Sequence, residues 1–131
     1  LDRNLGQETI ILKEFSVMTG NLTTPTAVVR AKIGDEEAIA SNFGVGPIDA
    51  ALKAVEEMIG GYTQVKVRDF SLEAITGGSD ALAEVTVSVE DEEGRVVSAQ
   101  SASADIATAS VDALIAAINI LLEKKKLWSM E

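Results

Sequence analysis

The stretch Lys13-Glu14-Phe15-Ser16-Val17 returns 55 residues later as Arg68-Asp69-Phe70-Ser71-Leu72, with the same order of charges and the same aromatic residue. Further along, Asp35-Glu36-Glu37 is matched by Asp91-Glu92-Glu93 at an offset of 56. Each match is short, but they occur in the same order at nearly constant spacing. The sequence therefore predicts an internal duplication, with two equivalent halves and a seam between them where a ligand can bind.

Each half predicts three strands followed by a helix. In the second half, Val85, Val87 and Val89 alternate with polar residues, which is typical of a strand with one buried face. The expected strands are residues 8–18, 27–33, 38–43, 62–75, 81–89 and 96–101, and the expected helices are residues 47–59 and about 105–126. This pattern predicts an α+β fold of two pseudo-symmetric βββα units, with helices packed on antiparallel sheet.

Length and pattern predict one domain at residues 8–131, preceded by a linker remnant at residues 1–7. The first repeat is expected at about residues 8–60 and the second at about residues 62–123. The longest apolar stretch, residues 115–122, is too short to cross a membrane and contains Asn119.

Composition narrows the possible functions. The net charge of −10 argues against nucleic acid and against an anionic membrane as partner, because both require a basic surface. The chain has no His and no Cys, so the commonest general base, zinc ligands and thiol nucleophile are missing. We therefore expect no catalysis by this chain itself and no metal site. Zero cysteines also fit a cytoplasmic location.

The two expected helix starts occupy equivalent places, because Gly46-Pro47-Ile48 aligns with Ala104-Asp105-Ile106 at an offset of 58. Small residues such as Gly44 let a ligand approach the backbone, whose N–H groups favour an anion. Asp49 and Asp105 lie beside the first turns, where they can cap the helix or receive an ammonium group. This arrangement suits a zwitterion such as a free amino acid, although plain helix capping explains the same residues.

A second group of small or apolar residues surrounds the expected turn at residues 76–79. Its members are Val67, Phe70, Ala74 and Ala81. They could form a pocket for an aliphatic side chain, or they could simply belong to the core.

Three ordered motifs carry a resemblance to a known family. They are residues 44–50 (GVGPIDA), residues 74–81 (AITGGSDA) and residues 105–110 (DIATAS), the last followed by Ala117-Ile118-Asn119. Together they resemble the C-terminal regulatory domain of 2-isopropylmalate synthase, which the related citramalate synthases share. The similarity covers about residues 8–122. It implies a duplicated βββα domain that forms a homodimer and binds the end product of the pathway.

The resemblance also implies a site and a parent enzyme. The polar groups of the effector would meet the backbone around residues 46–49 and 105–107, and its side chain would lie among apolar residues. The expected effector-binding residues are Gly44, Gly46, Pro47, Ile48, Asp49, Val67, Phe70, Ala74, Ala81, Asp105, Ile106 and Ala107. No cofactor is expected in this domain. The parent would carry a catalytic TIM barrel with a divalent metal, use acetyl-CoA as substrate, and hold its metal through histidines that this chain lacks.

The leading hypothesis is a feedback-inhibition and dimerisation domain that senses leucine in leucine biosynthesis. An isoleucine-sensing domain of a citramalate synthase is the alternative within the family, because moving one methyl group changes binding by only about 1–3 kcal/mol. A purely structural dimerisation domain is the alternative from another class.

Overall fold

The computed structural model describes residues 9–77 and 80–129, with side chains placed for residues 9–75 and 81–125. The predicted linker remnant and part of the predicted turn at residues 76–79 lie outside this description. The elements in chain order are β1 (Ile10–Gly20), β2 (Thr23–Ile33), β3 (Glu36–Phe43), α1 (Pro47–Gly60), β4 (Val65–Gly77), β5 (Asp80–Asp91), β6 (Val96–Ser103) and α2 (Ile106–Ser129). The predicted βββα order in each half is confirmed.

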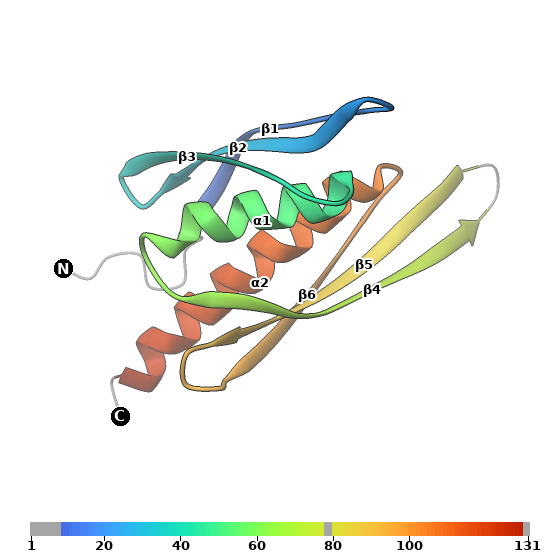
Figure 1. Cartoon of the computed structure of the whole chain (residues 1–131). Coiled ribbons are helices and arrows are strands. Elements are labelled where there is room, and N and C mark those ends of the chain that lie inside the picture. The colour runs from blue at the N-terminus through green and yellow to red at the C-terminus, as the bar shows by residue number, and fades with distance from the viewer. Residues whose placement is uncertain (1–8, 78–79, 130–131) are drawn as a thin grey trace.

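Each unit forms its own three-stranded antiparallel sheet, in the order β1-β2-β3 and β4-β5-β6. Figure 1 shows the two helices lying between the two sheets. The hairpins β2–β3 and β5–β6 turn at Gly34 and Gly94, whose φ angles are +62° and +84°. Residues with a Cβ rarely adopt this conformation, so glycine at both turns is required by the backbone.

The repeated stretch, residues 13–17 in the first unit and 68–72 in the second, begins at a β-bulge in both units. The β1–β2 register shifts between Leu12 and Glu14, and the β4–β5 register shifts between Val67 and Asp69. The extra residue in each strand places the following phenylalanine opposite a buried valine. The duplication therefore preserves an irregularity of the backbone together with its sequence.

The core lies between the two sheets. α1 packs on β2 and β3, α2 packs on β5 and β6, and the helices pack against each other. The inner faces of the sheets supply Val29 and Val87, both fully buried, and the helices supply Val55 and Leu114. Burial of such aliphatic side chains stabilises the fold by about 1.5–3 kcal/mol each.

Some element boundaries differ from the sequence prediction. β4 begins at Val65 rather than at residue 62, because the N–H groups of Tyr62 and Thr63 both donate to the carbonyl of Ile59 and close the end of α1. α2 continues beyond the lysines at residues 124–126 to Ser129. Favourable charges at a helix end do not by themselves terminate the helix.

The prediction that no apolar stretch reaches membrane length was wrong. Ile106–Lys125 in α2 is long and apolar enough to cross a membrane by length and composition, with mean hydropathy 1.7 over its most apolar window. Half of that window is buried inside the protein, where α2 packs on β5, β6 and α1. α2 is therefore a helix of the hydrophobic core of the domain.

Candidate functional site

The first turns of the two helices meet in one cavity of about 640 Å³ at the end of β1. In Figure 1 both helices point their N-terminal ends toward the same side of the molecule. The lining residues come from three elements and the segment before α2: Phe15, Ser16, Val17, Thr19, Pro47, Ile48, Ala104, Asp105, Ile106, Ala107 and Thr108. Five of the residues predicted from sequence are therefore brought together: Pro47, Ile48, Asp105, Ile106 and Ala107.

The start of α1 is held by Asp49. Its Oδ2 atom accepts the backbone N–H of Val45 at 3.0 Å and lies 3.2 Å from Nζ of Lys53. The hydrogen bond from Val45 is the main reason that the pKa of Asp49 is lowered; partial burial opposes this effect and Lys53 reinforces it. The carboxylate thus closes the helix start, and neither Asp49 nor its neighbour Gly46 lines the cavity.

Gly44 is required by close packing at this helix start. A Cβ atom at Gly44 would lie 2.6 Å from the backbone nitrogen of Ala50 and 2.9 Å from the carbonyl carbon of Asp49. These are backbone atoms of α1, so the contact cannot be relieved by a side-chain rotation.

We therefore expect Gly44→Ala to destabilise the domain by about 1–3 kcal/mol, because the α1 start must move away from the loop. Gly46→Ala is the matched control, since a Cβ there would meet nothing within 4 Å and its φ of −156° suits any residue. Urea unfolding of the two variants checks this expectation. Equal stabilities would contradict it.

The start of α2 is capped by Asp105. Its Oδ1 atom accepts the N–H of Ala107 at 3.0 Å, and its Oδ2 atom accepts the hydroxyl of Thr108 at 2.9 Å. Its own N–H donates to Oγ of Ser103 at 3.1 Å. The carboxylates of Asp49 and Asp105 are therefore both engaged by neighbouring donors. The remaining first-turn N–H groups have no intrahelical partner and can face an anion.

Apolar side chains form the walls of the cavity below the helix starts. Phe15 and Val17 of β1 are half-buried and pack against the core, while Ile106 is 37% exposed. Ser16 and Thr19 add hydroxyl groups. The cavity thus combines backbone donors at two helix ends with an apolar wall, which is the chemistry of a site for a small molecule with a carboxylate and an aliphatic part.

The other predicted residues lie on the second sheet and do not line this cavity. Val67 is half-buried, and its N–H donates to Oε2 of Glu56 at 2.9 Å. Phe70 and Ala74 lie on β4 and are exposed, as is Ala81 on β5. Their inclusion in an effector site stays a prediction.

Sequence reasoning missed the residues that β1 contributes. Phe15 lines the cavity and is the repeat equivalent of Phe70, which was singled out instead. The internal repeat contained the information needed to find Phe15, because Phe15 lies 55 positions before Phe70 and is its equivalent in the first unit. What the repeat did not indicate is which of the two equivalent phenylalanines faces the helix starts.

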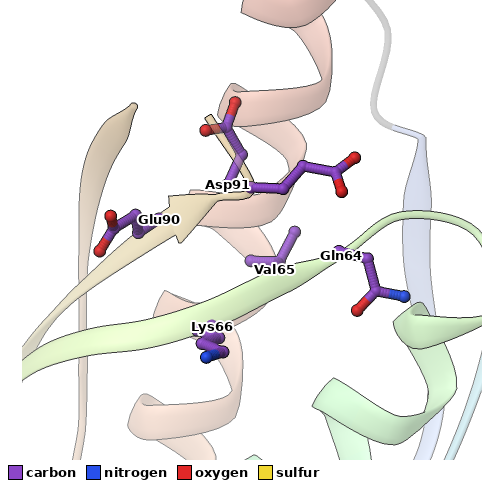
Figure 2. Close-up of a pocket in the computed structure, with 6 residues that line it drawn as sticks. Gln64, Val65, Lys66, Glu90 and Asp91 are labelled. Carbon is purple, nitrogen blue, oxygen red and sulfur yellow. The ribbon is translucent and has the colours of Figure 1, made fainter. Parts of the chain in front are cut away.

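A second cavity of about 420 Å³ lies where β4 begins and β5 ends (Figure 2). It is lined by Gln64, Val65, Lys66, Glu90, Asp91 and Glu92. Asp91 is 5% exposed, and it accepts hydrogen bonds from the N–H groups of Glu93 and Arg95 and from Nε of Arg95. Its carboxylate therefore closes the β5–β6 hairpin. Among the residues that the structure describes, no cluster of acidic residues is arranged to hold a metal ion.

The pKa of Asp91 predicts an acid-sensitive hairpin. Burial alone would raise this pKa, but the backbone N–H groups of Arg95 and Glu93 and the Arg95 guanidinium outweigh it, so the pKa is lowered. A lowered folded-state pKa gives stability that is present above the unfolded pKa of about 3.9 and is lost as the pH falls through the folded value.

At neutral pH, Asp91→Asn should cost about 1–3 kcal/mol. The difference from wild type should begin to shrink as the pH falls below about 4, where Asp91 becomes protonated in the unfolded chain, and should vanish as the pH falls through the lowered folded-state pKa. Urea unfolding at several pH values measures this, with Glu92→Gln as the exposed neighbouring control. A difference that is independent of pH would refute the role of the ionised carboxylate.

Comparison with known proteins identifies the family of this chain. Residues 2–122 match the family model described as the LeuA allosteric (dimerisation) domain. The chain belongs to this family. The LeuA domain is 55% identical over 120 residues to a probable 2-isopropylmalate synthase of Methanosarcina acetivorans, covering 92% of this chain and 23% of the relative.

Two relatives from Methanocaldococcus jannaschii carry different names. A 2-isopropylmalate synthase is 47% identical over 115 residues, covering 88% of this chain and 22% of the relative. An (R)-citramalate synthase, CimA, is 42% identical over 120 residues, covering 90% of this chain and 24% of the relative. The LeuA domain thus spans about a quarter of the length of these relatives. The predicted family is confirmed, and these relatives are named as 2-isopropylmalate and citramalate synthases.

Proposed function

We propose that this LeuA domain is the feedback sensor of a 2-isopropylmalate synthase and binds leucine in the cavity at the helix N-termini. The observation that carries the proposal is the meeting of both helix starts with the apolar face of β1 in one cavity. The leucine carboxylate would accept N–H groups of the first turns, and its isobutyl group would lie against Phe15, Val17 and Ile48.

The energies fit this role. Burying a leucine side chain contributes about 1.5–3 kcal/mol. An allosteric coupling of about 1–3 kcal/mol is enough for regulation. A domain of this kind needs no catalytic group of its own, which agrees with the chemistry available to a chain without His or Cys.

The ammonium group of leucine needs an acceptor that is not used for capping. Asp49 is paired with Lys53, and both carboxylate oxygens of Asp105 accept hydrogen bonds from α2. The hydroxyl groups of Ser16 and Thr19, which line the same cavity, can accept instead.

Calorimetric titration with leucine, isoleucine and valine tests the proposal. Leucinamide is the matched control, because it keeps the isobutyl group but lacks the carboxylate that the helix starts would bind. We expect heat with leucine and much weaker binding of leucinamide. If none of the three amino acids binds to the folded dimer, the domain has a purely structural role in dimerisation.

Isoleucine remains the second candidate effector, because the relatives include a citramalate synthase at 42% identity. Tighter binding of isoleucine than of leucine in the same titration would favour that assignment.

We extend the proposal to the parent enzyme. It would be an acyltransferase of the cytoplasm that condenses acetyl-CoA with a 2-oxo acid on a divalent metal in a separate TIM barrel. The LeuA domain would pair two such chains as a homodimer and contribute regulation. Light scattering of this chain at micromolar concentration should give the mass of a dimer.

A further inference from the structure

Asn119 joins the two units through the backbone of the first strand. Its Oδ1 atom accepts the N–H groups of Thr9 at 3.1 Å and Ile10 at 2.8 Å, and its Nδ2 atom donates to the carbonyl of Ile10 at 3.1 Å. We call this set of three hydrogen bonds the Asn119 clasp. All three join residues about 110 positions apart in the chain.

The clasp takes the place of a neighbouring strand at the free edge of sheet β1-β2-β3. Among the described residues β1 is an edge strand, so no described strand pairs with the outward backbone groups at its start. A carboxamide can accept and donate side by side in this way, whereas an ionised carboxylate lacks the donor and an aliphatic side chain lacks both. Ile10 is 1% exposed, so these backbone groups lie at the edge of the core, where leaving them unpaired is costly.

The same two elements, β1 and α2, also line the candidate effector cavity. Phe15 and Val17 lie further along β1, and Ala107 lies in the first turn of α2. Asn119 follows Ala107 by twelve positions, which is about 18 Å along the helix axis. The clasp therefore lies toward the other end of this strand and helix pair from the effector cavity.

A cavity of about 340 Å³ beside the clasp separates parts of β1, β6 and α2. Leu12, Asp112, Ile115 and Asn119 are among the residues that line it. β1 and α2 make few direct contacts, so the Asn119 clasp is the main direct link between them, while α1 packs against both. A shift of α2 as a rigid body at its first turn would also change the geometry at Asn119.

The geometry points to the Asn119 clasp as a joint between the effector cavity and the start of β1. Through this joint, ligand binding in the cavity would alter the hydrogen bonds of the backbone at Thr9 and Ile10. This inference rests on the proposed function, because it takes binding at the helix starts as the input. The output is the hydrogen bonding of Thr9 and Ile10, which couples the sensor to the polypeptide that precedes β1.

Amide hydrogen exchange of this chain, with and without leucine, tests the joint. In the wild type, leucine should change the exchange rates of Thr9 and Ile10 by about three- to tenfold, the effect of altering one hydrogen bond. Asn119→Ala should speed exchange at both amides and abolish their response to leucine, while calorimetric affinity changes by no more than the same roughly three- to tenfold, because the coupling is reciprocal.

Two further variants make the result specific. Asp112→Asn changes a residue of the same helix that lines the same separating cavity but makes no hydrogen bond to β1 among the described contacts, so it should keep the response. Asn119→Asp keeps both acceptor contacts and serves if the alanine variant does not fold; it should retain a weakened response.

The outcomes separate the two proposals. Leucine binding in the wild type without a change at Thr9 and Ile10, or a response that survives in Asn119→Ala, would overturn the clasp alone. No heat and no exchange response anywhere in the wild type would overturn the proposed function and the clasp together.

Discussion

Ala107→Trp is expected to weaken leucine binding by about 10- to 100-fold, which corresponds to the contribution of one buried aliphatic side chain. Ala107 is half-buried in the first turn of α2 and lines the cavity at the helix starts. An indole placed there occupies space that the isobutyl group needs. Calorimetric titration of the variant against leucine measures the loss.

Ala81→Trp is the matched control for this change. Ala81 is exposed on β5 and lies outside the cavity, on the surface that sequence reasoning associated with Phe70 and Ala74. Under the proposal it should bind leucine like the wild type. A loss of binding in Ala81→Trp with none in Ala107→Trp would move the effector site to the inner face of the β4–β5 hairpin. Light scattering of both variants should still report the wild-type mass.

Leu114→Ala is expected to cost about 2–5 kcal/mol of unfolding free energy, because it removes a fully buried side chain and leaves a cavity. Leu114 belongs to the buried core, on a helix that packs against β5, β6 and α1. A loss of this size is a large fraction of the total stability of a domain. Chemical denaturation followed by circular dichroism measures it.

Leu72→Ala makes the same chemical change at an exposed site. Leu72 is 46% exposed on β4, although its cross-strand partner Val85 is fully buried. We expect a loss of less than about 1 kcal/mol. If both variants lost equal stability, either Leu114 would not belong to the core or the dimer partner would cover Leu72. Repeating the measurement over a range of protein concentrations distinguishes these two explanations, because dimer stability depends on concentration.

Strand alternation and the internal repeat were enough to predict the βββα order, since these patterns are local properties of the chain. Val85, Val87 and Val89 alternate as predicted and are all fully buried. Boundaries were less predictable, because they depend on contacts between distant segments. The hydrogen bonds from Tyr62 and Thr63 to Ile59 delay the start of β4, and no local pattern announces them.

The candidate site shows the same division. The expectation drawn from the helix starts and the family resemblance named Pro47, Ile48, Asp105, Ile106 and Ala107, and these five residues line one cavity. It did not select the wall opposite them. β1 rather than β4 lines this cavity because of how the two units pack on each other. Since the two strands have equivalent sequences, the sequence does not indicate which of them lies beside the helix starts.

The sequence by itself determined the duplication, the order of strands and helices, and the chemistry of the helix starts, because periodicity and capping act over a few residues. Tertiary structure alone decided that both helix starts open into one cavity beside β1. It also decided that Asn119 binds the backbone of Ile10, because this contact spans 109 positions and exists only when the two units pack together.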